Sequence, residues 1–489
     1  EDGVTAIASA PVKWRKNGSD IVDIVNTDGS GDYTVSGALL LPGDVVTLFI
    51  GGATEKSVTM LLIGDSNTIT GIDLWRNHVI TRAASGALRP VFGSHFTSGY
   101  VSSDSNMTDV FTYTNNDMTM KSGMKLMVWD QYETAGDITS SGVTVRGAFR
   151  LTEHTLTADA LTMNTGTDFA AGTGTVDING AFTHNFGTFD QGQAPMYISG
   201  DFTIGTGATF TKSENDSPLV FDGDLTLDIR QNVNLGDVQI GSSPDTTTLS
   251  GHLIADSLAV SAGDVLITNG FNVIVGTGGI TNSGTIIAGY GSGGTTSIGT
   301  ASGFVNIGTY RSGGTDLTLS GSLRNSGTFD HGSGNVILQG MGEGVSIDGP
   351  IGFNNLTITG SSVYTLTAAM TLSGTLTMTG GGIDNSGNNN ITLSGSWLNY
   401  GNQYTRGTET ITFDGTPDES EQAKIIETTG FNNVTLDNGL VGYWKFDEGG
   451  GTVARDSSTN SNDGTLTNMD TSIAWVDVSA GTGTTNFYN

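Results

Sequence analysis

The clearest candidate for ion binding lies near the start of the chain, in Asp28-Gly29-Ser30-Gly31-Asp32. Asp28, Ser30 and Asp32 place side-chain oxygens at positions i, i+2 and i+4, which is the spacing at the start of a calcium-binding loop. The bidentate glutamate of a complete EF-hand loop does not follow, and an Asp/Gly-rich turn explains the same residues. Calcium is therefore the one candidate cofactor, with a plain turn as the alternative.

A second group of carboxylates alternates along residues 220–228. Asp222, Asp224 and Asp228 could share one face of a strand, and Arg230 follows closely. Enzymes that cleave polysaccharides need paired carboxylates or a basic residue on one face. A solvated outer face of a strand explains the same alternation, and sequence does not give the distance between carboxylates. We predict no catalytic residues and no enzyme, and keep a polysaccharide lyase or hydrolase on a β-helix as an alternative.

The other side chains that commonly do chemistry are dispersed. No histidine lies within four residues of another and there are no cysteines, so the sequence contains no local zinc motif. Trp397, Tyr400 and Tyr404 could stack on a sugar, although cross-strand packing is the favoured interpretation. The six histidines are His78, His95, His154, His184, His252 and His331.

The composition favours short strands joined by tight turns. The 489 residues include 73 Gly and only 8 Pro, and 36% are hydrophobic. The net charge is −30, from 19 basic and 49 acidic residues, so nucleic acid is excluded as a partner. No apolar run approaches the ~18 residues of a membrane span, so we expect no membrane insertion. The chain begins at Glu1 rather than Met, as a processed, secreted protein would.

A repeat of about 20 residues runs through residues 141–437 and is clearest late in the chain. Similar segments begin at Thr371, Ile391 and Ile411. Longer matches join residues 317–323 to 391–397, and residues 352–357 to 430–435. Asn-Ser-Gly recurs at Asn282, Asn325 and Asn385, with variants at Asn185 and Asn399.

The repeat predicts a parallel β-solenoid over residues 141–437, because 20 residues are too few for a domain and enough for one coil. We expect roughly 15 coils and a rod of about 70 Å at the usual strand spacing. Asn residues at equivalent corners should form hydrogen-bonded ladders along the axis. The region resembles the Gly/Thr/Asn-rich repeats of bacterial surface proteins and adhesins. A stack of Greek-key sandwiches is the alternative architecture.

The residues before the shaft divide into two parts. Residues 1–90 predict a small β-sandwich, with strands every ~8–12 residues. Residues 28–37 and 42–44 resemble Ig-like, carboxypeptidase-regulatory-like modules of bacterial surface proteins. Residues 91–140 are expected to be strands that cap the solenoid. The one helix that we predict is short, over residues 418–426.

The segment 438–489 changes character. Residues 439–452, 456–458 and 462–468 resemble the opening of concanavalin A-like, laminin-G-like jelly-roll modules. Such a module is much longer than the 51 residues from Gly439 onward, so this one would be incomplete. An incomplete sheet has open edges, which either more chain or a neighbouring molecule would pair. No binding residue is carried over from that family.

The whole is predicted to be all-β: a small sandwich, a parallel β-solenoid shaft and an incomplete jelly-roll segment. We expect an extracellular structural protein of a microbial cell surface, which assembles with copies of itself into a filament or stalk by β-sheet completion. The first alternative is an adhesin that binds cell-surface glycans.

Overall fold

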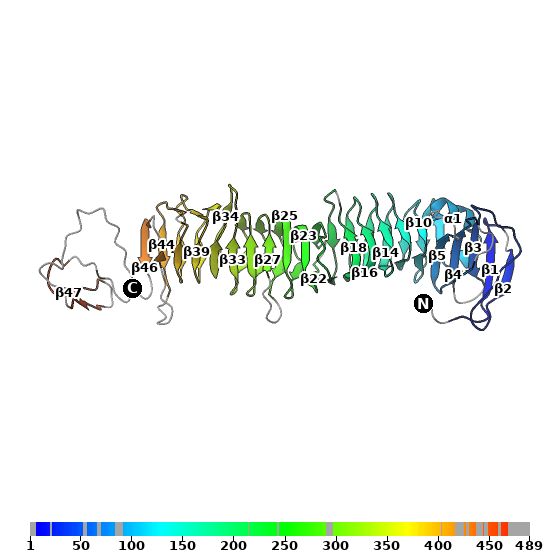
Figure 1. The fold of residues 1–489 in the computed structure, drawn as a ribbon, viewed down its shortest axis with the longest axis horizontal. Coiled ribbons are helices and arrows are strands. Elements are labelled where there is room, and N and C mark those ends of the chain that lie inside the picture. The colour runs from blue at the N-terminus through cyan, green and yellow to red at the C-terminus, as the bar shows by residue number, and fades with distance from the viewer. Residues whose placement is uncertain are drawn as a thin grey trace.

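The computed structural model describes residues 6–19, 22–51, 56–65, 70–83, 91–213, 215–241, 244–289, 297–401, 403–415, 425–426, 430–436, 444, 448–457 and 461–467. The protein is nearly all β, with 50% strand and 3% helix. A long shaft of stacked strands carries a head at its N-terminal end (Figure 1). The predicted all-β class and parallel β-solenoid are confirmed.

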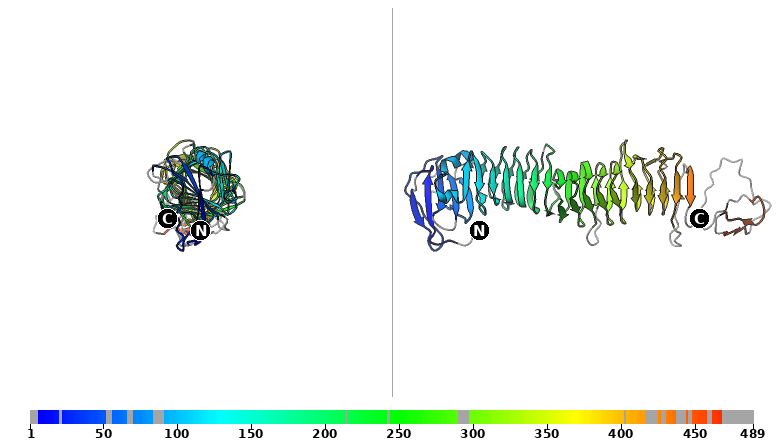
Figure 2. Two further views of the ribbon diagram at one scale, coloured as in Figure 1. Left: turned by 90° about the vertical axis from the view of Figure 1, so that its right-hand side faces the viewer. Right: turned by 180° about the vertical axis from the view of Figure 1, so that it is seen from behind.

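The shaft is a β-solenoid of about 17 turns, and each turn contributes a short strand to each of three faces. One turn contains β11 (Ile138–Ser140), β12 (Val143–Val145) and β13 (Ala148–Arg150). In the next turn, β11 and β12 pair in parallel with the two halves of β14 (Leu156–Met163), and β13 pairs with β15 (Asp168–Ala170). Seen along its axis, the shaft has a rounded outline (Figure 2).

The strands of the three faces follow one another in parallel register, and some long strands bend from one face to the next. The first face continues from β8 (Asp117–Met120), β11 and β14 through β16 (Val176–Asp190), β17 (Met196–Ile198), β19 (Leu219–Phe221), β21 (Asp237–Ile240), β23 (Leu253–Val260), β25 (Val273–Asn282), β28 (Phe304–Asn306), β31 (Leu323–Asn325), β34 (Ser346–Asp348), β37 (Val363–Leu366) and β40 (Gly382–Asp384) to β43 (Tyr404–Thr405).

The second face starts in the head. It contains β5 (His78–Ala83), β9 (Lys125–Val128), β12, β14, β16, β18 (Phe202–Thr211), β20 (Leu225–Ile229), β22 (Thr246–Leu249), β24 (Val265–Ile267), β26 (Thr285–Ile287), β29 (Thr309–Arg311) and β32 (Thr328–Asp330). A separate five-stranded sheet continues it with β35 (Ile351–Phe353), β38 (Met370–Leu372), β41 (Ile391–Leu393), β44 (Thr410–Phe413) and β46 (Asn433–Leu436).

The third face is interrupted once between β18 and β23, where Asn234, outside the named strands, forms a single bridge to Ile254. It contains β6 (Val91–Phe92), β10 (Gln131–Glu133), β13, β15, β16 and β18, and then β23, β25, β27 (Ser297–Thr300), β30 (Asp316–Leu319), β33 (Asn335–Leu338), β36 (Asn355–Ile358), β39 (Leu376–Met378), β42 (Trp397–Asn399) and β45 (Ile425–Ile426).

Alternation at period two explains why these segments form the shaft. Inward side chains are apolar and buried, while outward ones are mostly Thr, Ser, Asn and Asp. On the third face the paired inward residues lie 19, 20, 20 and 21 positions apart, which confirms the predicted repeat of about 20. These residues are Leu317, Val336, Leu356, Leu376 and Trp397.

Aromatic side chains stack between neighbouring coils in the first half of the shaft. The rings of Phe169 and Phe189 lie 4.7 Å apart at 7°, and those of Phe182 and Phe202 lie 4.8 Å apart at 12°. Each ring therefore packs on its equivalent in the next coil, which buries it fully and fixes the register of the two strands.

An asparagine ladder lies inside the shaft, as predicted. The Nδ2 of Asn282 donates to the Oδ1 of Asn306 at 2.7 Å, and the Nδ2 of Asn306 donates to the Oδ1 of Asn325 at 2.8 Å. Asn306 also donates to the carbonyl of Thr328 at 2.9 Å. Asn306 lies in Asn-Ile-Gly, so the Asn-Ser-Gly motif identified only the two ends of this ladder.

The head is a small antiparallel sheet that merges into the second face. β1 (Pro11–Lys16) pairs with β2 (Asp23–Asn26) and β3 (Val45–Ile50), and β3 pairs with β4 (Ser57–Leu62). These strands fit the predicted small sandwich. The direction changes at β5, which runs parallel to β4 and to β9 of the shaft.

Residues 91–140 contain helices as well as strands. α1 (Gly93–Gly99) and α2 (Ser105–Thr108) precede the hairpin of β7 (Phe111–Thr114) and β8. The helices were not predicted, since neither is long enough to show an apolar stripe. β9 and β10 already belong to the faces of the shaft.

One sequence prediction in the second half of the chain needs correction, and one sequence match joins different faces of the shaft. Of the predicted helix over residues 418–426, residues 418–424 lie outside the described residues and Ile425–Ile426 form strand β45. The match between residues 317–323 and 391–397 does not mark equivalent faces, because β30 lies on the third face and β41 on the second. Each of the two matching segments consists of a strand, a corner and a second strand. A unit of this kind fits at more than one corner of the coil.

The asparagine ladder gives a stability prediction. Asn306→Ala removes three hydrogen bonds and leaves Asn282 and Asn325 with buried polar atoms that have lost a partner. We expect the free energy of unfolding to fall by about 2 kcal/mol, since leaving a buried polar group unpaired costs ~1–3 kcal/mol. Urea denaturation measures the change. The control is Asn185→Ala, which breaks a 2.7 Å bond to Asn164 at an exposed corner, and an equal loss in both variants would contradict the account.

Candidate functional site

The C-terminal end of the shaft exposes side chains whose equivalents are buried in the preceding coils. β46 pairs with β44 along one edge, and no other described strand pairs with its second edge. Val434 follows the buried residues Ile391 and Ile411 in its column, yet it is 47% exposed. Leu436 follows Phe413 and is 48% exposed. An open backbone edge and apolar side chains thus lie together at this end.

The third face ends in the same way. Ile425 of β45 pairs with Trp397, which is fully buried, but Ile425 itself is 49% exposed. Phe431 packs between the faces, with its ring 5.1 Å from that of Trp397 and 6.0 Å from that of Phe413. Phe431 therefore covers part of the final core layer, and no further described strand pairs with the outer edges of β45 and β46.

The N-terminal end of the shaft is covered. Phe96 of α1 is fully buried, and its ring lies 5.4 Å from Tyr132, 5.6 Å from Tyr113 and 6.2 Å from Phe111. The helix and the β7–β8 hairpin therefore close the core at that end. Repeat proteins generally need such capping elements at both ends, so the open C-terminal end is the candidate functional site.

The head has an open edge of its own. β2 pairs only with β1 among the described strands. Ile24 of β2 is 56% exposed, and Leu39 and Leu41 are exposed in the same head. β2 lies in the head beyond one end of the stacked strands, and β46 lies at their other end (Figure 1).

Charge is distributed unevenly along the chain. Residues 1–150 contain 11 of the 19 basic residues and 16 of the 49 acidic residues, a net charge of −5. The remaining residues therefore carry −25. The head and the first coils hold most of the positive charge, whereas the rest of the chain is strongly acidic.

The predicted calcium ligands form a closed turn. The Oδ1 of Asp28 accepts the amide N–H groups of Ser30 at 2.8 Å and Asp32 at 3.0 Å, so that oxygen is already used within the loop. No group of three or more His, Asp or Glu side chains that could hold a metal occurs among the described residues. Calcium binding through Asp28, Ser30 and Asp32 stays a prediction.

The carboxylates of residues 222–228 each have a separate partner. Asp222 accepts from the Oγ of Ser199 in the preceding coil, and Asp224 accepts from the amide of Thr246 in the following coil. Asp228 accepts two N–H groups of Arg230, at 2.8 and 2.5 Å. These bonds tie corners and neighbouring coils together, which is a structural role.

Two residues of the suggested sugar-stacking group lie in the core. Trp397 and Tyr404 are buried, with their rings 5.0 Å apart, and only Tyr400 is exposed. The hydroxyl of Tyr404 donates to the buried carboxylate of Glu409. Cross-strand packing is therefore what these two aromatics do.

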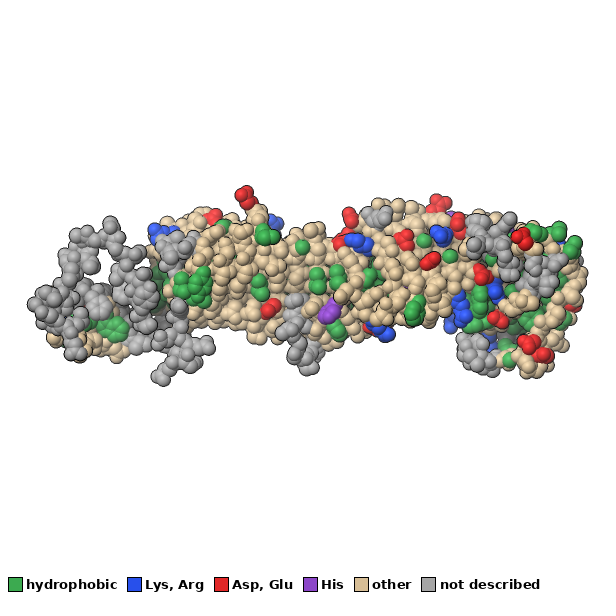
Figure 3. All heavy atoms as spheres, in the orientation of Figure 1, with side chains coloured by type: hydrophobic (Ala, Val, Ile, Leu, Met, Phe, Trp, Pro, Cys, Tyr) green, Lys and Arg blue, Asp and Glu red, His purple; other side chains and the backbone are tan. Residues whose placement is uncertain are grey.

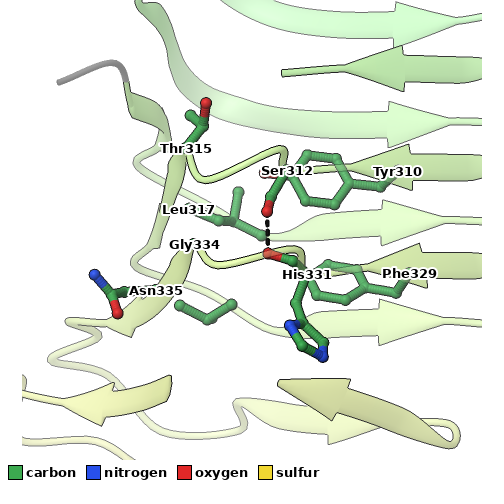
Figure 4. Close-up of a pocket in the computed structure, with 9 residues that line it drawn as sticks. Tyr310, Ser312, Thr315, Leu317, Phe329, His331, Gly334 and Asn335 are labelled. Atoms are coloured by element: carbon green, nitrogen blue, oxygen red, sulfur yellow. Dashed lines mark hydrogen bonds between the residues drawn. The ribbon is translucent and has the colours of Figure 1, made fainter. Parts of the chain in front are cut away.

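The described surface has no deep cavity to hold a small substrate. The best-formed crevice lies between two coils, where the ring of Tyr310 stacks on Phe329 at 5.0 Å (Figure 4). The hydroxyl of Ser312 donates to the carbonyl of His331 across it. Side chains fill the crevice and leave no room for a water molecule. A partner of the rod would therefore contact its outer surface or its ends.

His184 is fully buried inside the shaft. His184 lies between Phe182 and Phe189, and its Nε2 is 3.1 Å from the carbonyl oxygen of Gly187, to which it donates in the neutral tautomer. Burial lowers the pKa of His184 below its usual value of 6.5, because a charged ring would lose its hydration. The ring is a neutral part of the core.

The segment after the shaft is described only in part. β47 (Val453–Ala454) and β48 (Gly464–Thr465) form a small antiparallel pair. The indole N–H of Trp444 donates to the carbonyl of Asn462 at 2.9 Å. These contacts join the beginning and end of the jelly-roll-like motif, and the laminin-G-like identity of residues 438–489 stays a prediction.

Comparison with known proteins gives no family. No protein-family model, no curated protein and no solved structure matches the chain. None of the described helices is long and apolar enough to cross a membrane. Inferences about function therefore rest on the structure itself.

The buried histidine gives a pH prediction. The unfolded chain binds a proton at His184 more readily than the folded one, so the free energy of unfolding should fall as the pH drops below about 6.5. The slope contributed by this residue is at most about 1.4 kcal/mol per pH unit. Urea denaturation of the wild type and of His184→Leu across this range measures it. We expect His184→Leu to have a shallower slope, whereas the control His252→Leu, at an exposed position, should keep the wild-type slope; identical slopes in all three proteins would contradict the prediction.

Proposed function

We propose that this chain is an extracellular structural protein, a rod that joins end to end with copies of itself into a filament or stalk on a microbial cell surface. The observation that carries the proposal is the open end of the shaft, where β46 and its half-exposed apolar residues lack a covering coil among the described residues. A further strand placed on this edge would complete the sheet and bury Val434 and Leu436.

The shaft suits a mechanical role. Its strands lie across the axis, so the backbone hydrogen bonds between coils run along it and link each coil to the next. About 17 turns at the usual spacing of ~4.8 Å give a length of roughly 80 Å. A stack of this kind keeps its dimensions without disulfides, which suits a chain that contains no cysteine.

The occupant of the open end is, in this proposal, the head of a second copy. The head offers the open edge of β2 and exposed Ile24, and it lies at the other end of the rod. Joining two different surfaces at opposite ends gives a contact that does not close, and therefore a filament. The basic residues of the head also reduce its repulsion from the acidic remainder of a neighbour.

The remaining parts of the proposal rest on composition and resemblance. The head resembles Ig-like modules of bacterial surface proteins, and residues 438–489 resemble the start of a jelly roll. The outer edges of the β47–β48 pair, which follows the shaft, would contribute to sheet completion between copies. We propose no enzymatic activity, and this is supported by the separate structural partners of Asp222, Asp224 and Asp228.

A double variant tests the end-to-end contact. Val434→Asp with Leu436→Asp places two charges on the apolar end, and burying them against another copy would cost several kcal/mol. We expect the wild type to form chains of rods by negative-stain electron microscopy and the double variant to give single rods. The control is Ile274→Asp, which replaces an equally exposed apolar residue on the side of the shaft and should leave assembly unchanged.

Filaments of wild-type length in the double variant would contradict the proposal. A chain that ends at residue 437 separates the two contributions to the contact. Chains of rods from this shortened protein would assign the contact to the shaft itself, and their loss would assign part of it to residues 438–489.

A further inference from the structure

Arginine and tryptophan side chains stack along the axis where the shaft begins. β5 pairs with β9 so that Thr81 lies opposite Val128, and β9 pairs with β12 so that Val128 lies opposite Val145. The residues that follow, Arg82, Trp129 and Arg146, therefore occupy the same corner of three successive coils. The register continues this column to Asn164 and Asn185, which are joined by a hydrogen bond.

The distances show cation–π contacts among Arg82, Trp129 and Arg146 in this column. The Cζ of Arg82 lies 5.0 Å from the ring centre of Trp129, and the Cζ of Arg146 lies 4.7 Å from it. Arg146 is also 4.7 Å from the ring of Trp75, which stands 6.1 Å from Trp129 at 75°. All four side chains are half-buried, so solvent reaches the group. In Figure 3 basic and hydrophobic side chains lie together where the shaft meets the head.

Arg82 and Arg146 differ in the groups that balance their positive charge. Arg82 lies 3.5 Å from the carboxylate of Asp130 and donates to the carbonyl of Gly71. The guanidinium of Arg146 makes no hydrogen bond or ion pair within the described part of the chain, although acidic residues outnumber basic ones by 30. Arg146 is thus a half-buried cation that two indole rings hold in place, and no described residue accepts a hydrogen bond from its guanidinium N–H groups.

We infer that Trp75, Trp129 and Arg146 form a binding site for a saccharide that carries a carboxylate, such as a uronate unit of a surface polysaccharide. The planar guanidinium of Arg146 matches a carboxylate through two parallel N–H···O bonds. The indole of Trp75 offers an apolar surface with a polar edge beside it, which suits the alternating C–H and hydroxyl groups of a sugar ring. Asp130 beside Arg82 limits the local positive charge and disfavours a densely charged polyanion such as nucleic acid.

The shape of the surface also favours a unit of a longer polymer. A small molecule is usually held in a concave pocket that covers most of its surface, and the best-formed crevice of the described residues has no room for water. A polysaccharide lying along the rod can add weak contacts from many copies in a filament. The site itself stands on the geometry of one chain and does not depend on the filament proposal.

Trigalacturonate and a neutral trisaccharide are suitable probes, with tryptophan fluorescence and calorimetry as readouts. We expect saturable binding of trigalacturonate by the wild type and weaker binding of the neutral sugar. Arg146→Gln should weaken binding of the acidic sugar by about tenfold or more, because a charge-assisted pair is lost. Arg146→Lys keeps the positive charge but loses the planar guanidinium with its two parallel N–H donors. Its affinity for the acidic sugar should lie between those of the wild type and Arg146→Gln.

The control is Arg324→Gln, at an exposed arginine of the shaft that pairs with Asp348 at 2.9 Å, and it should bind as the wild type does. Thermal melting establishes that each variant is folded, and Arg146→Lys provides a second variant if Arg146→Gln is not. The inference is overturned if the wild type shows no saturable binding at millimolar trigalacturonate, or if Arg146→Gln binds as tightly as the wild type. It is equally overturned if the neutral sugar binds as tightly as the acidic one. Side-by-side pairing of rods that needs Arg146 and occurs without sugar would instead assign the partner to a carboxylate of a second copy.

Discussion

Every residue of the shaft must match the residue that lies one coil above it and one coil below it. Parallel pairing brings equivalent side chains into contact along the axis, so each side chain must be compatible with its two neighbours in the column. Phe169 on Phe189, Asn282 on Asn306, and Arg82 on Trp129 and Arg146 are three solutions to this constraint. The constraint acts between neighbours only, which allows the rod to be long without a large core.

The same constraint makes the two ends of the stack different from its middle. Every coil covers its neighbour, and among the described residues the first and last coils each lack a neighbouring coil on one side. Phe96 of α1 closes the N-terminal end, whereas Val434, Leu436 and Ile425 remain half-exposed at the other. Because an open edge of this kind would pair with any available strand, a stable protein must cover it or use it. A head-to-tail contact would use this open edge. Because the two ends of the molecule differ, copies of one chain would then be sufficient to build a filament.

The sequence predicted the length of the structural repeat, but it did not predict on which face of the shaft each strand lies. Alternation at period two, coils near 20 residues and the Asn282–Asn325 ladder could be predicted, because they follow from local patterns. The faces could not be assigned, since residues 317–323 and 391–397 are nearly the same strand–corner–strand unit on different faces. The column of Arg82, Trp129 and Arg146 was missed for a related reason: its members lie 47 and 17 residues apart and share no motif. Trp397 and Tyr404 were considered for a surface role, but an inward position at the corner buries both.

The absence of cysteine from the sequence permits a direct test of the head-to-tail contact. Ile24→Cys on β2 and Leu436→Cys on β46 are placed in one chain, and the two single variants are prepared alongside. Mild oxidation followed by denaturing electrophoresis then reports which ends meet. The account predicts a ladder of covalent multimers in the double variant, with at most dimers in either single variant. Monomers alone, or dimers of the Leu436→Cys single variant as abundant as the products of the double variant, would contradict a head-to-tail filament.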